Sequence, residues 1–587
     1  MTDSQKPPHW ELDRLYVRDS ASLKAELESL DTQSRSFMSY RERLSSCEPV
    51  DISELGQMIE KLEKVTILCE RISSFAHLGF AADTSDQKAL SFLLSSEEML
   101  AKHYNDTIFF EMWWKNLTDS EAQPYMDALK AHSYWLSRMR AFRVNTLSEA
   151  EEKIINLKDL TGSESIVKLY DTITNSYRFR SDFWPDSDQR WLTREELSVH
   201  IRSHLPEVRA GAYQELYRVY AQDSAVLGQI YQVLLRDWNT EKVGLRKYPS
   251  PRAVRDKAND LAPQTVDSLL RVCRQKAPIV FGRYFKKKAQ KLGLKQLRRY
   301  DLYAPLLPSE DTYTFPEGLD EVEKAFRSFD QKFADLAMNV PRERHLSAEI
   351  KPGKQSGAFC ASTVPGEVPW VLMSYTGNRH DLFTLAHEFG HAVHSQLAAD
   401  LSVFNFHSAL PLAETASTMA EMILARSLRQ KASSGPEIED LNFKLLDDAY
   451  ATVGRQVFFA LFEVEAHEMV AGGATTEELA EAYYKNLAGQ FGQSIELSNE
   501  FRWEWLSIPH FYHTPFYVYA YSFGQLLVYS LWRIYEREGA AFVPKFLTIL
   551  SRGGSASPDN ILAEAGLGPL DDDFWTGGFE VIESFLD

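Results

Sequence analysis

The feature that most constrains the fold is a helical segment, Asp381 to Leu397, that carries two histidines four residues apart. Its letters are DLFTLAHEFGHAVHSQL, in which apolar residues recur at helical spacing and no proline interrupts the run. Residues four apart lie on one face of a helix, so His387 and His391 present two imidazole nitrogens to one point. The sequence therefore predicts a metal-binding helix, with Asp381 as its N-cap.

Glu388 directly follows the first of these histidines and completes the pattern His-Glu-Phe-Gly-His. In this pattern the two histidines bind zinc, and the glutamate acts as general base and then general acid on a zinc-bound water. The alternative interpretation is two hydrogen-bonded histidines on a buried helix. Because three fixed positions match by chance in roughly a few per cent of chains this long, residues elsewhere must decide.

A catalytic zinc ion usually takes three protein ligands and keeps a fourth position for water. A third histidine in the pattern HExxHxxGxxH is ruled out, because His394 stands where glycine is needed and Leu397 where histidine is needed. A glutamate after eighteen or nineteen intervening residues is ruled out as well, because those positions hold Leu410 and Pro411. The next acidic residue after Asp400 is Glu414, which lies at the start of a predicted helix in PLAETASTMAEMILA. We therefore predict Glu414 as the third ligand of a single Zn²⁺ ion, which two histidines and one carboxylate suit well.

Two further residues share faces with these ligands. Glu421 lies seven residues after Glu414 on the same helical face, so we expect it to accept a hydrogen bond from a ligating histidine. Direct binding of the metal by Glu421 is the alternative. His394 lies on the face of His387 and His391, and we expect it to support the site or to pack in the core, because a fourth protein ligand would leave no room for water.

At 587 residues the chain exceeds the size of one hydrophobic core, so two or more lobes are expected. From about residue 20 to 180 the periodicity is helical and prolines are few, which predicts an all-helical N-terminal region. Residues 178–197 are aromatic, polar and contain a proline, so we interpret them as a connector. This division predicts an N-terminal helical domain over 1–185 and a catalytic domain over 186–587.

Between residues 351 and 375, glycines and prolines separate short β-favouring runs, GAFCAST and PWVLMSY. This pattern predicts a small sheet directly before the metal-binding helix. An exposed edge of such a sheet binds an extended peptide through main-chain hydrogen bonds, although a purely structural hairpin is the alternative. We expect Gly357 and Ala358 to belong to a flexible substrate loop.

Composition excludes several classes of protein. The net charge of −19 argues against a nucleic-acid partner. The chain has no run of about 18 uncharged apolar residues and no signal-peptide layout at its start, so we expect a cytoplasmic protein with no membrane span. Four widely spaced cysteines predict reduced thiols, and Cys360 alone lies close to the metal motif: Cys47, Cys69, Cys273 and Cys360.

On these residues the chain resembles the thimet oligopeptidase and oligoendopeptidase F family of zinc metallopeptidases, and more closely its bacterial oligoendopeptidase F branch. The resemblance rests on TLAHEFGHAVHS, on LAETASTMAE with Glu414 and Glu421, on KPGKQSGAFC, and on IPHFYHTPFYVYAYSFG near the C-terminus. It implies a mainly α fold with two helical lobes around a deep substrate channel. It also implies hydrolysis of internal peptide bonds in short oligopeptides.

The C-terminal motif supplies six side-chain donors within twelve residues: His510, Tyr512, His513, Tyr517, Tyr519 and Tyr521. The negatively charged intermediate of peptide hydrolysis needs such donors, and the resemblance implies that a histidine and tyrosines of this segment provide them. We favour His510 and Tyr517, with Tyr521 and His513 next. Packing in an aromatic helix is the alternative for each tyrosine.

Three other points complete the functional prediction. His407, seven residues before Glu414, is expected either to contact substrate or to make a structural hydrogen bond. A binding protein without catalysis would have lost Glu388 or a metal ligand, and neither is lost. A zinc carboxypeptidase or dipeptidase on a related helical fold is the alternative activity, and it would need groups that capture a terminal charge.

Overall fold

The computed structural model describes residues 7–18, 20–46, 48–183, 190–306, 312–432 and 434–587. Over these residues the fold is mainly α, as the resemblance implies, and it contains three small sheets, of which the sequence predicts one. The chain forms two compact units, each assembled from three segments. Unit 1 comprises Met1–Arg143, Ser309–Lys431 and Glu538–Leu567, and unit 2 comprises Val144–Pro308, Ala432–Arg537 and Gly568–Asp587.

The predicted division of the chain at residue 185, and the channel between its lobes, stay predictions. The compact units do not follow that division, because helices that pack together come from distant parts of the sequence. Within the predicted connector, β1 (Phe179–Arg180) pairs antiparallel with β2 (Trp191–Leu192). Residues 184–189 of the connector lie outside the described residues.

Unit 1 is mainly helical in its N-terminal segment and in the segment that contains the metal motif. Its α-helices are α1 Ala21–Met38, α2 Tyr40–Ser45, α3 Ile52–Ala82, α4 Gln87–Asn116, α5 Asp119–Ala128, α6 Ser133–Ala141, α14 Phe315–Phe329, α15 Gln331–Arg342, α16 Arg379–Leu397, α17 Val403–Phe406, α18 Leu410–Ala413, α19 Thr415–Lys431, α25 Val543–Ser551 and α26 Pro558–Glu564. Short 3₁₀ turns lie at Leu12–Arg14 and Gly539–Ala541.

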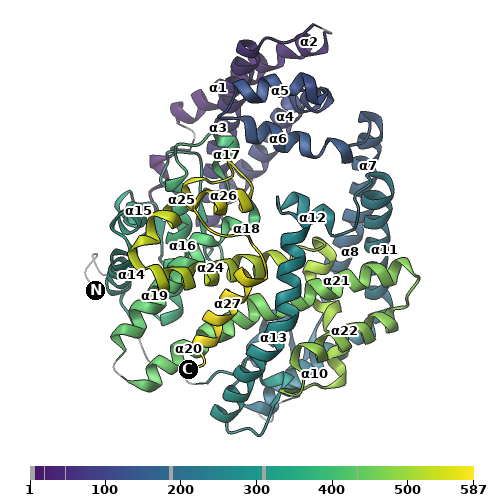
Figure 1. Cartoon of the computed structure of the whole chain (residues 1–587), viewed down its shortest axis with the longest axis vertical. Helices are drawn as coiled ribbons and strands as arrows, with labels where there is room; N and C mark the ends of the chain where they lie inside the picture. The colour runs from purple at the N-terminus through teal and green to yellow at the C-terminus, as the bar shows by residue number, and fades with distance from the viewer. Residues whose placement is uncertain (1–6, 19, 47, 184–189, 307–311, 433) are drawn as a thin grey trace. The chain divides into compact units, whose positions relative to one another are not determined.

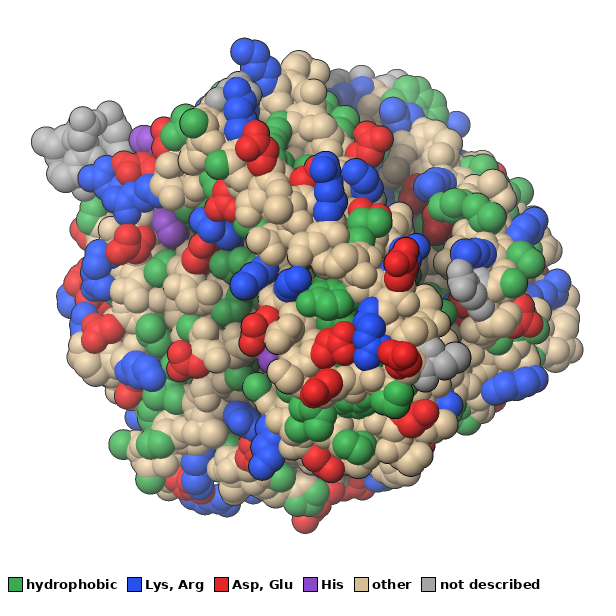
Figure 2. All heavy atoms as spheres, turned by 90° about the horizontal axis from the view of Figure 1, so that it is seen from above, with side chains coloured by type: hydrophobic (Ala, Val, Ile, Leu, Met, Phe, Trp, Pro, Cys, Tyr) green, Lys and Arg blue, Asp and Glu red, His purple; other side chains and the backbone are tan. Residues whose placement is uncertain are grey.

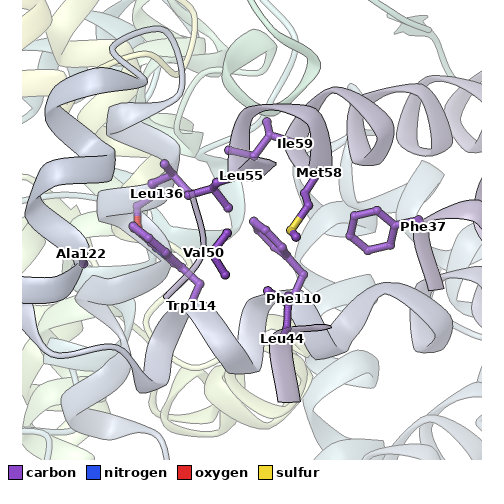
Figure 3. Packing of buried hydrophobic residues seen from close by; sticks show 10 residues of the cluster. All are labelled: Phe37, Leu44, Val50, Leu55, Met58, Ile59, Phe110, Trp114, Ala122 and Leu136. Carbon is purple, nitrogen blue, oxygen red and sulfur yellow. The ribbon is translucent and has the colours of Figure 1, made fainter. Parts of the chain in front are cut away.

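The N-terminal helices of unit 1 share a buried apolar cluster, shown in Figure 3. Its members are Phe37, Leu44, Val50, Leu55, Met58, Ile59, Phe110, Trp114, Ala122 and Leu136. Trp114 is fully buried and its indole N–H donates to the carbonyl of Leu136 at 2.8 Å, so the polar atom of this large side chain is satisfied. Apolar residues on the facing sides of these helices thus build this part of the core.

The small sheet predicted before the metal helix is present in unit 1. Its strands are β4 Leu346–Ser347, β5 Phe359–Ala361 and β6 Trp370–Leu372, in the order β4-β6-β5. The central strand β6 is fully buried, whereas β5 is half-buried at an edge of the sheet and pairs antiparallel with β6. β5 therefore offers the edge nearest to α16, which it contacts.

Unit 2 is also mainly helical. Its α-helices are α7 Glu149–Thr161, α8 Ser163–Ser176, α9 Arg194–Ile201, α10 Pro206–Gln222, α11 Ser224–Trp238, α12 Ala253–Ala258, α13 Pro263–Lys291, α20 Gly435–Ala449, α21 Arg455–Ala471, α22 Thr476–Phe491, α23 Pro509–His513, α24 Tyr519–Glu538 (its last residue in unit 1) and α27 Asp572–Ser584. Its other elements are π-helical turns at Asn239–Leu245 and Tyr450–Gly454, 3₁₀ turns at Arg299–Asp301 and Asn499–Ser507, and the parallel strands β3 Leu297–Arg298 and β7 Ile495–Glu496. One further 3₁₀ turn, Arg143–Asn145, lies at the boundary of the two units.

The surface carries charges of both signs, and the described cysteines form no disulfide. Figure 2 shows acidic and basic side chains interspersed over the face that it presents. Among the helices that the structure describes, none has both the length and the apolar character that a membrane span requires. Cys69, Cys273 and Cys360 are free thiols, and Cys47 lies outside the described residues.

Candidate metal centre and catalytic residues

The metal-binding helix α16 begins three residues earlier than the predicted N-cap indicates. Its N-cap is Asn378, whose side chain accepts a hydrogen bond from the backbone N–H of Asp381 at 3.0 Å. The carboxylate of Asp381 in turn accepts the N–H groups of Thr376 at 2.6 Å and Gly377 at 2.8 Å. The prediction of Asp381 as N-cap is therefore wrong: Asp381 is the third helical residue, and it closes a capping box that secures the start of α16.

Three side chains of unit 1 converge on one point. The Nε2 atoms of His387 and His391 each lie 3.3 Å from Oε2 of Glu414. In a tetrahedral zinc site with ligand bonds of about 2.0–2.1 Å, neighbouring ligand atoms are about 3.3 Å apart. The two nitrogen–oxygen separations match that spacing, so these three partly exposed side chains could hold a metal ion.

Glu414 lies at a break between two helices rather than within one. It is the C-cap residue of α18, directly before the first residue of α19, and its carboxylate also accepts the hydroxyl of Ser417 at 2.8 Å. α19 packs along α16, its neighbour in Figure 1. The break aims the carboxylate of Glu414 at the two histidines, while the helix that follows fixes its backbone.

Gly390, which the sequence interpretation passed over, sets the distance between these helices. A Cβ atom at this position would lie 2.6 Å from the carbonyl oxygen of Ala416 and 2.5 Å from the Cα of Ser417. No other residue type allows α16 and α19 to approach so closely. A glycine inside a buried helical run is a recognisable signal of such an approach.

Glu421 orients the first histidine. Its Oε1 lies 2.6 Å from Nδ1 of His387, so it accepts the proton of that nitrogen and leaves Nε2 of His387 to face Glu414. The carboxylates of Glu414 and Glu421 also change the pKa of His387. Burial alone would lower the pKa of His387, but the hydrogen bonds to Glu414 and Glu421 raise it to about 10.

The hydrogen bonds with the histidines also shift the pKa of Glu414, in the opposite direction. Burial alone would raise the pKa of its carboxyl group, but His387 and His391 hold that pKa far below its usual range. Glu388 differs, since it is 6% exposed and burial raises the pKa of its carboxyl group. The centre therefore stabilises a positive charge between the histidines and Glu414, next to a carboxylate that takes up a proton more readily than usual.

A cavity of about 440 Å³ opens over the centre within unit 1. Besides His387, Glu388, His391 and Glu414, it is lined by Ala358, Phe359, Cys360, Ser362, His394, Ser395, Phe406, His407, Ser408 and Ala413. The predicted loop residue Ala358 and the edge strand β5 therefore form one wall. Gly357 precedes them with φ +88°, a backbone conformation that glycine adopts freely.

The two remaining histidines of the region have different surroundings. His394 is buried, and burial lowers the pKa of its imidazole to about 4, so it is neutral near pH 7. Its ring bonds to the backbone of Ala413, directly before Glu414. His407 faces the cavity, on a segment secured by the bond from Gly554 N–H to the carbonyl of Asn405 at 2.8 Å.

Three of the six predicted donors form a cluster in unit 2. The rings of His510 and Tyr517 are parallel with centroids 5.8 Å apart, and the ring of Tyr521 stands across Tyr517 at 5.2 Å. The hydroxyl of Tyr521 lies 3.3 Å from Nε2 of His510. All three side chains are half-buried, and burial lowers the pKa of His510, which favours a neutral imidazole.

The other three donors have partners elsewhere in unit 2. Tyr512 is buried and stacks on Tyr170 with ring centroids 3.7 Å apart. The buried hydroxyl of Tyr519 donates to Asp256 at 2.9 Å. His513, the fourth of the favoured donors, lies 2.8 Å from the carboxylate of Asp171.

Comparison with known families gives two matches. Residues 199–580 match the model described as peptidase family M3, and residues 113–179 match the model described as oligopeptidase F. The chain is 27% identical to an oligoendopeptidase F homolog of Lactococcus lactis over 98% of this chain and 96% of that protein. It is 25% identical to oligopeptidase PepF of Bacillus subtilis over 95% of this chain and 83% of that protein.

Solved structures share the fold. A putative peptidase from Chlamydophila abortus superposes with a TM-score of 0.85 at 22% identity, covering 99% of this chain and 100% of that chain. Oligoendopeptidase-F from Enterococcus faecium superposes with a TM-score of 0.71 at 22% identity, covering 96% of this chain and 98% of that chain. Both likenesses agree with a mainly helical architecture.

Proposed function

Because the chain belongs to peptidase family M3, a family of metallopeptidases that act on oligopeptides, we propose that it is a zinc-dependent endopeptidase cleaving internal bonds of short peptides. One observation carries the proposal. The Nε2 atoms of His387 and His391 each lie 3.3 Å from the carboxylate oxygen Oε2 of Glu414, beside the buried Glu388, in the wall of an open cavity. In this proposal His387, His391 and Glu414 hold one Zn²⁺ ion, with Glu421 orienting His387.

A zinc ion held by these residues would supply a water ligand of lowered pKa and polarise the substrate carbonyl. Glu388 would take the proton of that water on a carboxylate oxygen and deliver it to the leaving amine. One carboxylate serves both steps only where its proton affinity is intermediate. The burial that raises the pKa of Glu388 supports this double role.

The substrate side of the proposal uses β5. Phe359–Ala361 form an edge strand, and its residues Phe359 and Cys360 line the same cavity as Glu388. A peptide that paired with this edge would be bound through its main chain, which tolerates many side-chain sequences. His407, Gly357 and Ala358 would then contact the peptide around the cavity.

The remaining role is that of hydrogen-bond donor to the negatively charged intermediate. We assign it to His510 and Tyr517, with Tyr521 beside them. Their support is local: these three rings cluster and stay half-buried, whereas Tyr512, Tyr519 and His513 have other partners. A neutral imidazole and a phenol each donate one hydrogen bond without adding a charge.

The experiment that tests this function uses an internally quenched peptide blocked at both ends. An endopeptidase cleaves it and needs no terminal charge, whereas a carboxypeptidase or dipeptidase leaves it intact. We expect cleavage at an internal bond, loss of cleavage when chelation removes the metal, and recovery with one equivalent of Zn²⁺. Hydrolysis of the unblocked peptide alone, one or two residues from an end, would establish the alternative activity.

A further inference from the structure

The turn that carries Tyr517 is strained, and residues outside the turn hold it. Thr514–Val518 join α23 to α24, and Phe516 in their middle has φ +57°. Three other described non-glycine residues have positive φ, Lys247, Asp260 and Arg344, and none of them is buried. Phe516 is 1% exposed. A buried aromatic residue in the left-handed region persists only where its surroundings enforce that conformation.

Glu463 of α21 supplies the main enforcing contact. Its Oε1 accepts the backbone N–H of Phe516 at 2.8 Å, and this hydrogen bond is buried. Glu463 itself is 1% exposed, and burial raises the pKa of its carboxyl group to about 8, so near pH 7 it binds Phe516 mainly as the neutral acid. Without an acceptor here, the N–H group of Phe516 would be buried and unsatisfied.

Two further contacts fix the same turn from unit 2. His467, one helical turn after Glu463, stacks its ring on Phe516 with centroids 4.8 Å apart. Arg255 donates from Nε to the carbonyl of Pro515 at 3.3 Å. Both polar groups of the peptide between Pro515 and Phe516 are therefore bound by side chains from other helices.

We infer that Glu463 is a positioning residue: by binding the N–H group of Phe516 it keeps the turn left-handed and places Tyr517 against His510. The inference rests on the proposed function, in which Tyr517 donates to the intermediate. If Glu463 lost its acceptor, Phe516 would relax to negative φ, and the next side chain in the chain, Tyr517, would swing off His510. Misplacement of a reacting group by about 1 Å can cost on the order of 100-fold in rate.

The experiment compares Glu463→Leu, which removes the acceptor at similar volume, with Glu463→Gln, whose amide oxygen still accepts. Glu465→Leu on the exposed side of the same helix is the matched control. We expect Glu463→Leu to keep its zinc content and its KM for a blocked peptide but to lose kcat by about tenfold or more. Glu463→Gln and the control should stay within about threefold of the natural protein, since neither removes the acceptor.

A double-mutant cycle with Tyr517→Phe separates the possible failures. If Glu463 acts through Tyr517, Glu463→Leu adds little to a chain that already lacks the Tyr517 hydroxyl. Equal losses in both backgrounds would overturn the positioning role while leaving the donor role intact. An unchanged kcat for Tyr517→Phe alone would instead overturn the donor assignment in the proposed function.

A second pair of variants tests the strained turn directly and does not depend on folding of Glu463→Leu. Glycine adopts φ +57° freely and a β-branched residue does not, so Phe516→Gly should retain far more kcat than Phe516→Val. Zinc content should be equal in both. Equal kcat for the two variants would show that the left-handed turn does not matter for Tyr517, and would overturn the inference.

Discussion

The metal half and the donor half of the proposed site are built in contrasting ways. In unit 1, His387, Glu388 and His391 lie on a regular helix, and the helix that carries Glu421 packs against it through Gly390. In unit 2, Tyr517 follows a buried residue in the left-handed region, in a turn between two helices. Helical hydrogen bonding fixes the backbone of His387, Glu388 and His391, whereas individual side-chain contacts fix the backbone of the second half.

This contrast has a functional reason in the proposed mechanism. A metal needs ligand atoms at fixed separations, which a rigid helix pair provides. A donor to the intermediate needs to match charge that develops during the reaction, and a turn can aim a side chain where no helix position would. The two halves should therefore fail differently: damage to the first loses the metal, and damage to the second loses rate with the metal retained.

The largest expected effect comes from removing a metal ligand. We expect His391→Ala to lose its zinc and to lose activity by more than the roughly 10–100-fold typical of residues that only support a ligand. His380→Ala is the matched control, since His380 is an exposed histidine on the same helix. Metal analysis and cleavage of a blocked peptide check both variants. Zinc retained at one per chain in His391→Ala would break the assignment of the metal half.

In the donor half, Tyr517→Phe should keep its zinc and lose kcat by about 10²–10³-fold, because one hydrogen bond to the intermediate is removed. Tyr512→Phe is the matched control in the same motif, since its buried hydroxyl has no hydrogen-bond partner among the described residues. Steady-state kinetics and metal content measured on the same samples check the result. A Tyr517→Phe variant that lost its metal would erase the proposed difference between the halves.

The structure brings together the three candidate ligands that the sequence selects, and the sequence could select them because their geometry is local. Helical spacing places His387 and His391 on one face, and the distance along the chain to the next acidic residue leads to Glu414. The N-cap was wrong, since the choice between Asn378 and Asp381 depends on the backbone that precedes the helix. Gly390 was passed over because its role depends on a second helix.

The donor half was predictable only as a group of candidates. Six donors within twelve residues are visible in the sequence, but which of them bind other side chains depends on partners far along the chain, such as Asp171 for His513 and Asp256 for Tyr519. No periodic pattern indicates that Phe516 is left-handed or that Glu463 binds it. Positions where the backbone departs from regular structure are those where local sequence rules fail.

A smaller effect tests the helix pair. Gly390→Ala should destabilise the protein by about 1–3 kcal/mol and weaken zinc binding, because the added methyl group forces α16 and α19 apart. Gly489→Ala, an exposed helical glycine whose added methyl group would meet no atom within 4 Å, should be neutral or stabilising. Thermal unfolding and zinc titration check the pair. Unchanged zinc affinity in Gly390→Ala would show that the separation of the helices does not control the ligands.

The smallest effect is a pH dependence of stability in the donor half. Burial raises the pKa of Glu463 from 4.5 to about 8 in the folded protein. Between these values the unfolded chain releases this proton and the folded chain keeps it, so the free energy of unfolding falls as pH rises. Relative to Glu463→Gln, the natural protein should lose on the order of 1–3 kcal/mol between pH 5 and pH 8. Thermal unfolding curves that shift in parallel with pH for both proteins would contradict a buried, ionisable Glu463.

The Glu388→Gln variant gives the sharpest test of the zinc-peptidase assignment, because it changes the proton-transfer group and leaves every proposed metal ligand in place. Zinc content and the rate of cleavage of a doubly blocked peptide should be measured on the same preparation. We expect one zinc ion per chain and a rate lowered by about 10²–10⁴-fold. A variant that holds its zinc and cleaves the peptide at the full rate would contradict the role of Glu388 and the mechanism built on it.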